Sequence, residues 1–333
     1  MSAVAAGRLR AILSRFDRAR VVVVGDLVAD EFIYGQIDRV SREAPVLILK
    51  YGSTEIVPGG AGNAAANAAA LGAHVQVVGA VGQDAAGDRL LDALGRTSDV
   101  KGVLRMKRGL TTVKTRILAG GVHSAKQQVV RIDRVGSPVP PATAQQIEST
   151  VARAIRKADA VILSDYGGGS ITPGGWRRAL AAARLKRPPV VLVDSRYALT
   201  AFTGMTAVTP NESEVEALLG VRINDDRGTL ERAGRKLLGQ LGSQAVLVTR
   251  GSRGMALFEP DRPTEHIPIV GSDQIADVTG AGDTVIATFA LALASGGSFV
   301  EAAHLANHAG GLVVMKRGTA TITRAELAAS IGR

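Results

Sequence analysis

Short apolar segments that alternate with helical stretches constrain this chain more than any other feature. Four segments are rich in branched aliphatic residues and end in small or polar ones: VVVVGD, AVILSDY, VVLVDS and AVLVTRG. Helix-forming stretches are predicted at 142–157, 173–185, 212–219 and 229–241. Strands that alternate with helices form right-handed βαβ units, so we predict an α/β fold with a doubly wound, mostly parallel sheet. Aromatic residues make up only 3% of the chain, which leaves valine, leucine, isoleucine and alanine to build its core.

Polar residues follow several of the predicted strands. They are Asp26, Asp165, Asp194, Asn211 and Thr249. The carboxyl ends of parallel strands lie at one edge of a sheet, and open α/β sheets bind their ligands there. We therefore expect the functional site at this edge.

Two stretches interrupt the alternation. Residues 31–57 contain short strand-like pieces with no helix between them, and residues 111–135 alternate like a β-hairpin. We predict that they form a small β-sheet inserted in a single domain that spans residues 1–333.

Composition narrows the class of protein. The chain has no cysteine, which excludes disulfides and thiolate metal sites. No apolar run approaches the ~20 residues that a membrane-spanning helix needs, so we expect a cytoplasmic protein without a membrane partner. The net charge of +10 suits either nucleic acid or phosphorylated small molecules. Nucleic-acid binding would also call for aromatic stacking residues, so we expect small-molecule ligands and no nucleic acid.

The segment DVTGAGDT, residues 277–284, is the most specific candidate for chemistry. Gly280 and Gly282 allow several backbone N–H groups to point the same way at the start of an apolar helix, which favours a bound anion. Asp283 would lie in the first turn, where it could take the proton of a hydroxyl that attacks a phosphoryl group. Taken alone, the segment is better explained by a carboxylate that only complements the helix dipole.

Three other segments are ambiguous by themselves. GAGNAA, residues 60–65, fits a loosened dinucleotide pattern, but the acidic residue expected after the next strand is missing. In TPNESE, Asn211 and Glu214 form a capping box or, alternatively, face a nucleotide, with Glu214 holding Mg²⁺ through water. The glycines of VTRGSRG, Gly251 and Gly254, suit an ordinary hairpin turn.

In this order and spacing, these segments resemble the ribokinase-like (PfkB) family of sugar kinases. The resemblance covers nearly the whole chain, and its two signature segments are PGGAGNAAANAAALG and DVTGAGDT. RVSREAPV, QQVVRID and LSDYGGG are most similar to the heptose 7-phosphate kinases of the bacterial ADP-heptose pathway. The resemblance implies ATP-dependent phosphorylation of the anomeric hydroxyl of D-glycero-D-manno-heptose 7-phosphate.

The resemblance also implies roles for the matching residues. Asp283 would be the catalytic base, and the amides of Gly280, Ala281 and Gly282 would form an anion hole. ATP and Mg²⁺ would be bound by Asn211, Glu214, Thr249, Gly251, Gly254 and Asn307. The sugar phosphate would be bound by Asp26, Asp30, Gly59, Gly60, Asn63, Arg131 and Arg196. Asp277 and Thr279 match a monovalent-cation site for K⁺, and the inserted sheet becomes a lid over the sugar and the interface of a homodimer.

Three departures concern the sugar rather than the chemistry. Arg42 replaces a proline, Ser195 and Arg196 replace a proline-lysine pair, and ILAGGVHSAKQQ is longer than its counterpart in the heptose kinases. Arg196 could still hold a phosphate, since arginine binds phosphate bidentately. Two alternatives therefore stay open: a kinase for another sugar or sugar phosphate, such as ribose or a fructose phosphate, and a non-catalytic sugar- or nucleotide-binding regulator.

Overall fold

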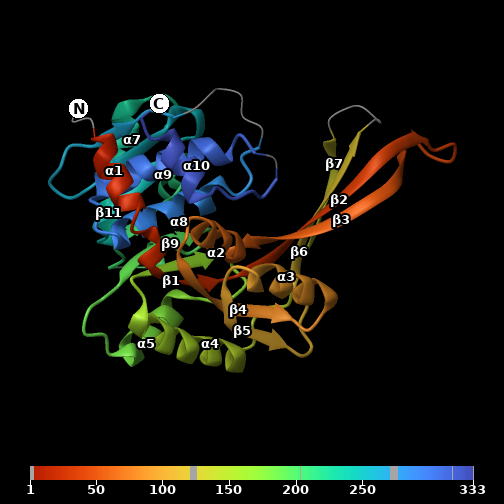
Figure 1. Ribbon diagram of the computed structural model, residues 1–333, viewed down its shortest axis with the longest axis horizontal. Coiled ribbons are helices and arrows are strands. Elements are labelled where there is room, and N and C mark those ends of the chain that lie inside the picture. Colours follow the sequence, from red (N-terminus) through yellow and green to blue (C-terminus); the bar gives the residue numbers. More distant parts are fainter. Residues whose placement is uncertain (1–3, 121–125, 203, 271–276, 317, 333) are drawn as a thin grey trace.

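The computed structural model describes residues 4–120, 126–202, 204–270, 277–316 and 318–332. A nine-stranded sheet runs through the body of the molecule, and a separate four-stranded sheet projects from one side of it (Figure 1). Residues 121–125, part of the predicted lid extension, lie outside the described ranges.

The large sheet is mostly parallel, as predicted. Its strand order is β13-β12-β11-β10-β9-β8-β1-β4-β5. The strands are β1 (Arg20–Gly25), β4 (His74–Gly82), β5 (Asp99–Met106), β8 (Ala160–Asp165), β9 (Val190–Ser195), β10 (Ala207–Val208), β11 (Ala245–Thr249), β12 (Met255–Phe258) and β13 (Glu265–Ile267). Only the β11–β12 and β12–β13 pairs are antiparallel among the described strands of this sheet.

Helices cover both faces of this sheet, so successive residues of a central strand enter different cores. Val21 and Val23 pack into a core with α1 (Ala6–Leu13), α2 (Ala61–Ala70), α3 (Ala85–Gly95), α8 (Ala281–Ala294), α9 (Phe299–Val313) and α10 (Arg324–Ser330). Val22 and Val24 pack into a second core with α4 (Pro141–Ala154), α5 (Pro173–Ala183), α6 (Glu212–Leu219) and α7 (Arg227–Leu241). Burial on both faces explains why β1 is a continuous run of valines.

Short 3-10 turns complete the helical content: Phe16–Arg18, Ile155–Lys157, Leu199–Ala201 and Gly251–Arg253. The arginine-rich N-terminal segment forms the short helix α1, which is docked on the body. It buries Leu9 and Ile12, and Arg8 Nε lies 2.8 Å from Glu301 of α9. No helix within the described ranges is long and apolar enough to cross a membrane.

The small sheet has the order β3-β2-β6-β7, and we call it the lid. Its strands are β2 (Leu27–Val40), β3 (Leu47–Gly60), β6 (Thr112–Gly120) and β7 (Gln127–Arg134). The prediction of short strand-like pieces at 31–57 was wrong, because this region forms two 14-residue strands that pair from their ends at Leu27 and Gly60. One bulge at Asp38 of β2 and another at Gly52 of β3 break the inside–outside alternation, and Pro58 is tolerated because β3 is an edge strand.

Candidate active site

The polar residues predicted from strand ends lie together at the carboxyl edge of the large sheet. Asp26 follows β1, Asp165 ends β8 and Asp194 lies near the end of β9. Asn211 forms an isolated β-bridge with Thr249, the last residue of β11. The base of the lid starts at this same edge, since β2 begins directly after Asp26. The strand order thus brings together the residues that were predicted to lie at this edge.

Asp283 lies in the first turn of α8 and is only 6% exposed. Its Oδ2 atom accepts a hydrogen bond of 2.7 Å from Asn63 Nδ2. Its Oδ1 atom is buried and has no hydrogen-bond partner within the described part of the chain. Burial, reinforced by the negative charge of Asp194, raises the pKa of Asp283 to about 8. The site thus holds a carboxylate with one anchored oxygen and one oxygen free to accept a proton.

The start of α8 requires glycine at one position. Gly280 precedes the helix with a φ of 77°, and a Cβ atom there would lie 2.4 Å from Asn63 Nδ2. The N–H of Ala281 donates to Val278 O at 3.2 Å, which closes the turn that leads into the helix. The other amides of this turn belong to the free amino end of a 14-residue helix, where a bound anion is favoured.

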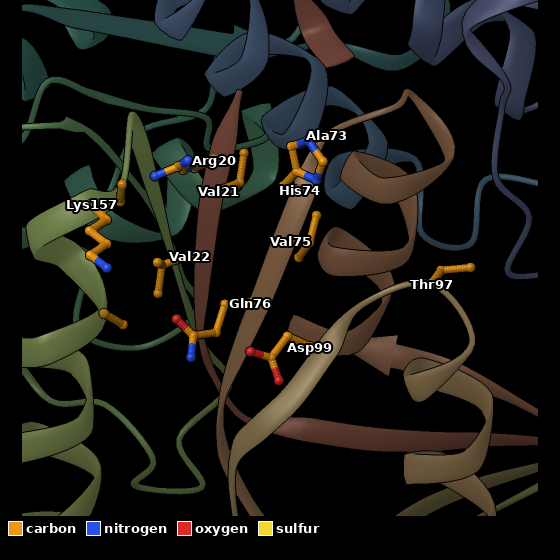
Figure 2. A pocket seen from close by; sticks show the side chains of 12 residues that line it. Arg20, Val21, Val22, Ala73, His74, Val75, Gln76, Thr97, Asp99 and Lys157 are labelled. Carbon is orange, nitrogen blue, oxygen red and sulfur yellow. The ribbon is translucent and has the colours of Figure 1, made fainter. Parts of the chain in front are cut away.

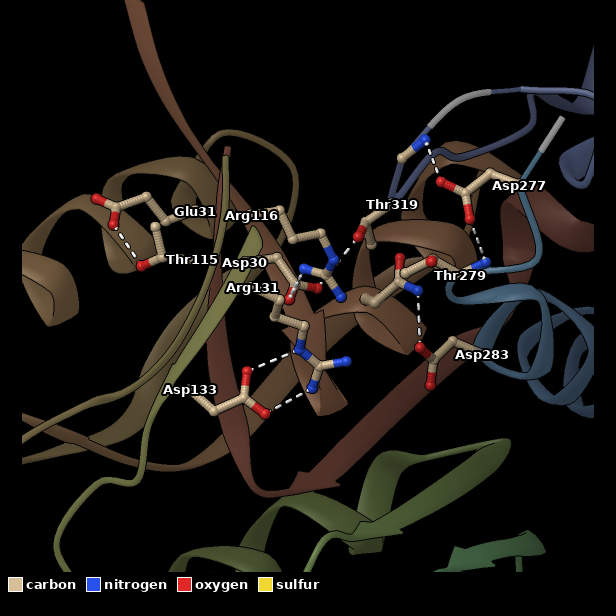
Figure 3. Close-up of polar contacts among 12 residues, drawn as sticks. Asp30, Glu31, Thr115, Arg116, Arg131, Asp133, Asp277, Thr279, Asp283 and Thr319 are labelled. Carbon is tan, nitrogen blue, oxygen red and sulfur yellow. Dashed lines mark hydrogen bonds and ion pairs between the residues drawn. The ribbon is translucent and has the colours of Figure 1, made fainter. Parts of the chain in front are cut away.

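The lid contributes a buried ion pair to the other side of the site. Arg116 of β6 lies 2.7 Å from Asp30 of β2, and Thr319 donates to the second oxygen of Asp30 at 3.1 Å (Figure 3). The close approach of β3 depends on glycine, because a Cβ atom at Gly59 would lie 2.5 Å from Asp30 Oδ2. Gly60 has a φ of 57° and ends β3 immediately before α2.

Basic side chains gather beside this ion pair. Lys114 of β6 lies 5.5 Å from the centre of the Tyr166 ring, and Arg131 of β7 forms two bonds of 2.7 Å with Asp133 (Figure 3). Burial lowers the pKa of Lys114, and the positive charges of Arg131 and Arg196 act on it in the same direction. Lys114 thus lies within electrostatic range of both arginines, and Arg196 is exposed to solvent. We call Lys114, Arg131 and Arg196 the basic cluster.

Asp26, a predicted site residue, and Ser195, one of the departures from the heptose kinases, fix the course of loops beside the site. Asp26 accepts hydrogen bonds from the N–H groups of Tyr166, Gly168 and Ser170 at 2.8–2.9 Å, so both of its oxygens shape this loop. Ser195 donates to Asp165 Oδ2 at 2.7 Å, a contact that was not predicted from the sequence. The N–H of the following residue, Arg196, donates to Asp165 O at 3.0 Å. Ser195 and Asp165 therefore fix the direction in which the chain presents Arg196.

A cavity of about 400 Å³ adjoins the start of α8. Five predicted nucleotide-binding residues line it: Asn211, Thr249, Gly251, Gly254 and Asn307. Ala281 lines it as well, which places the cavity next to the turn that carries Asp283. Its apolar walls, Met255, Val285, Gly310, Gly311 and Val314, were not predicted, although the glycine pair in HAGGLVV is a signal of a close approach.

Three of the predicted nucleotide-binding side chains, those of Asn307, Glu214 and Asn211, have partners inside the protein. Asn307 Nδ2 donates to Pro268 O at 2.8 Å. Glu214 forms a capping box with Asn211, with two bonds of 2.9 Å, and is not among the residues that line the cavity. The simpler interpretation of TPNESE is thus the one that this structure displays.

The chain matches the model of the pfkB family of carbohydrate kinases over residues 18–326. The chain belongs to this family. It is therefore an ATP-dependent sugar kinase, which agrees with the resemblance seen in the sequence.

Comparisons with individual proteins support the family and the fold. The chain is 40% identical over 324 residues to the bifunctional protein HldE of Geobacter metallireducens, a match that covers 96% of this chain and 65% of that protein. It thus spans about two thirds of the length of that relative. Ribokinase of Arabidopsis thaliana, solved with ribose and ATP, is 23% identical with a TM-score of 0.70. Phosphofructokinase-2 of Escherichia coli, solved with potassium, is 19% identical with a TM-score of 0.73. Both structural matches cover 95% of this chain and 99% of the other, and they show the fold.

The acidic residues Asp194, Glu214 and Asp165 of this sugar kinase repel one another. Burial, together with the charges of Glu214 and Asp165, raises the pKa of Asp194 to about 7. Such mutually repelling carboxylates are the hard oxygen donors that Mg²⁺ prefers. The described residues contain no group of three such side chains arranged to hold a metal ion, so a magnesium ion here would depend on ATP and water for its other ligands.

Asp277 organises the loop before α8. Its two oxygens accept hydrogen bonds from the N–H groups of Thr279, at 2.9 Å, and Gly318, at 3.0 Å (Figure 3). The carboxylate therefore holds two chain segments together. Asp277 and Thr279 are the residues that the resemblance links to a monovalent-cation site.

A second cavity, of about 540 Å³, lies at the opposite, amino-terminal edge of the sheet. Figure 2 shows Arg20, Gln76, Asp99 and Lys157 around it. None of the predicted site residues lines this cavity. Because these residues lie far from the active site, substitutions among them serve as controls for substitutions in the active site.

Proposed function

We propose that this kinase transfers the γ-phosphoryl group of ATP to the anomeric hydroxyl of D-glycero-D-manno-heptose 7-phosphate, giving the 1,7-bisphosphate. The observation that carries the proposal is the basic cluster, which consists of Lys114 and Arg131 of the lid and Arg196 of the body. A free sugar offers no group that needs three neighbouring cations, whereas a phosphate at the far end of the substrate does. The similarity to bifunctional protein HldE and the sequence segments shared with heptose kinases support the same choice.

Asp283 acts as the general base. Its Oδ1 atom accepts the proton of the anomeric hydroxyl, and that oxygen attacks the γ-phosphorus in line with the bond to the β–γ bridging oxygen. The new O–P bond forms as the old one breaks, ADP leaves, and the proton remains on Asp283. A carboxyl pKa raised to about 8 suits this task, because a base works best when its pKa is near the operating pH.

The backbone at the start of α8 stabilises the transferring group. The amides of Gly280 and Gly282 and the helix dipole favour negative charge at this end of the helix, whereas the N–H of Ala281, also predicted for the anion hole, donates to Val278 O. The cavity lined by Asn211, Thr249 and Asn307 would hold the nucleotide, with the adenine against its apolar wall.

Two cations are proposed with ATP. Mg²⁺ would neutralise charge on the phosphates, and Glu214 would hold it through water beside Asp194. K⁺ would bind to carbonyl oxygens of the loops that Asp277 joins, with Thr279 on one of them. The chain's own part in both cases is to place oxygen ligands near the start of α8.

The lid would also form a homodimer. Successive residues of a strand face opposite sides, so Val130 and Ile132 of β7 lie on the face away from Arg131 and the sugar. Their exposed fractions are 44% and 55%, and β7 is an unpaired edge of the lid sheet. An exposed edge strand with apolar side chains is a surface that a second copy of the chain would cover.

A phosphoryl-transfer screen tests the proposal. The protein is given ATP and Mg²⁺ with D-glycero-D-manno-heptose 7-phosphate, fructose 6-phosphate, ribose or the unphosphorylated heptose, and ADP release is measured together with the product. We expect the highest kcat/KM with the heptose 7-phosphate. A higher value for fructose phosphate or ribose would replace the proposed sugar by one of the alternatives. Absence of transfer to every sugar, with ATP bound, would favour a non-catalytic regulator.

A further inference from the structure

We infer that Asn67 is a positioning residue of this kinase: it fixes the side-chain amide of Asn63 so that the N–H, and not the carbonyl, faces Asp283. The inference rests on the proposed role of Asp283 as the base. It is based on a buried series of hydrogen-bonded side chains, the hydrogen-bond chain, that runs from Thr284 through Asn67 and Asn63 to Asp283.

This hydrogen-bond chain consists of three bonds, two that join α2 to α8 and one within α2. Asn63 Nδ2 donates to Asp283 Oδ2 at 2.7 Å, and Asn67 Nδ2 donates to Asn63 Oδ1 at 3.0 Å. Thr284 Oγ1 donates to Asn67 Oδ1 at 2.8 Å. Asn63, Asn67 and Thr284 are at most 1% exposed. Water therefore cannot replace a lost partner without entering the core, and each bond determines the direction of the next.

Backbone carbonyl groups determine the orientation of the side-chain amides of Asn63 and Asn67. Asn67 Nδ2 also lies 3.0 Å from Asn63 O, which can only accept, so the atom of Asn67 at this point must be the nitrogen. Its oxygen then faces Thr284, whose hydroxyl must donate. The same nitrogen faces the side chain of Asn63, whose nearest atom must be oxygen. The remaining nitrogen of Asn63 is directed at Asp283, with Gly280 O at 3.4 Å as a further acceptor.

The helices explain why these residues meet. Asn63 and Asn67 are four residues apart on α2 and lie on the same face, and Asp283 and Thr284 are neighbours in the first turn of α8, which packs against α2. The hydrogen-bond chain thus runs from Thr284, the residue next to the base, through α2 and back to Asp283 itself. The arrangement anchors Asp283 Oδ2 and leaves Oδ1 for the substrate.

The direction of the Asn63 amide matters for the charge on Asp283. A donated N–H favours the ionised carboxylate, and it opposes burial and the charges of Asp194 and Asp30, while Lys114 acts in the same sense as Asn63. Without Asn67, the Asn63 side chain can turn and present its carbonyl oxygen to the carboxylate. That orientation favours the protonated acid, which cannot act as a base.

The test compares three substitutions under the full reaction with ATP and the best sugar from the screen. Asn67→Leu removes the positioning amide, and Thr284→Val removes only the hydroxyl that faces it. Thr288→Val is the matched control, because Thr288 is equally buried on α8 but its hydroxyl donates to Thr284 O at 2.8 Å, outside the chain. For each variant, kcat and KM are measured across pH, and folding is checked by circular dichroism.

For Asn67→Leu we expect kcat to fall about ten- to a hundredfold, the usual effect of one lost hydrogen bond to a charged group. The acid limb of the pH profile should move up by about one pH unit, with KM for ATP within about twofold of wild type. Thr284→Val should show a smaller shift in the same direction, and Thr288→Val none. If Asn67→Leu does not fold, Thr284→Val against Thr288→Val decides the matter.

A folded Asn67→Leu protein with a wild-type acid limb and kcat would overturn the inference, as would equal shifts in Thr284→Val and Thr288→Val. A second measurement separates this failure from a failure of the proposed function. The pKa of Asp283 is measured by ¹³C NMR of its carboxyl group in the ligand-free protein, assigned with Asp283→Asn. Asn67→Leu should raise this pKa even if the wild-type protein phosphorylates none of the sugars tested. An unchanged pKa rejects the positioning role whatever the substrate is.

Discussion

Asp30 and Arg116 join two strands of the lid by an ion pair of 2.7 Å whose side chains are 7% and 10% exposed. The guanidinium group also lies 5.3 Å from the centre of the Phe32 ring, and Thr319 ties Asp30 to the chain beyond α9. The pair therefore lies where the lid meets the body, beside the proposed sugar site. Both charges lose their hydration when the protein folds, so each depends on the other to compensate for that loss.

Arg116→Ala should lower the free energy of unfolding by about 3–5 kcal/mol, because it leaves the Asp30 carboxylate buried without its partner. Urea denaturation measures the change. Arg131→Ala is a suitable control, since Arg131 lies opposite Arg116 in the β6–β7 register but its pair with Asp133 is largely exposed. The control should cost about 0–1 kcal/mol. Equal losses in both variants would mean that the buried pair has no special part in stability.

Asp283→Asn should lower kcat by several orders of magnitude and leave ATP binding nearly intact, because the amide cannot take the proton of the sugar hydroxyl. Steady-state kinetics and calorimetric titration of ATP measure the two effects. Asp99→Asn, in the remote cavity, should leave both unchanged. Near-normal turnover of Asp283→Asn would rule out Asp283 as the base.

The same substitution should change how stability depends on pH. The pKa of Asp283 rises from 3.8 to about 8 on folding, chiefly through burial, so the folded protein holds this proton more tightly than the unfolded chain does. The stabilisation is complete below about pH 4 and is lost as the pH rises through about 8. Asp283→Asn should therefore have a higher Tm than wild type near pH 8, and the difference should shrink towards pH 4. Differential scanning calorimetry of the ligand-free proteins measures it, and a difference independent of pH would contradict the shift.

Local patterns predicted the parts of the fold that depend on local chemistry. The valines of β1, the capping box of Asn211 and the glycine turn before Asp283 are each written in a few neighbouring residues. Contacts between distant segments were not predicted. The bond from Asn63 to Asp283 spans 220 positions, and the bond from Ser195 to Asp165 depends on strands β8 and β9 being neighbours. The bulges in β2 and β3 hid two long strands, because they shift the alternation by which a strand is recognised.

Ile132→Lys should weaken the proposed homodimer, because it places a charge on the apolar outer face of β7. Light scattering after gel filtration measures the molar mass over a range of protein concentrations. Met315→Lys makes a matched control, since Met315 is 42% exposed but lies outside the lid. A wild-type protein that is monomeric at all concentrations, or an Ile132→Lys protein that still dimerises fully, would refute a dimer through this face.

Arg196→Ala should raise KM for the phosphorylated sugar about tenfold and hardly affect the unphosphorylated analogue, because only the former offers a phosphate to the guanidinium group. The reasoning follows from the site: Ser195 and Asp165 fix the chain at Arg196, and the charges of Arg196 and Arg131 both act on Lys114. Steady-state kinetics with both substrates measures the effect, and Arg20→Ala, an exposed arginine of the remote cavity, is the control. If both substrates respond alike to Arg196→Ala, this arginine is no phosphate anchor. The basic cluster would then reduce to Lys114 and Arg131, and the preference for a sugar phosphate would have to come from the lid alone.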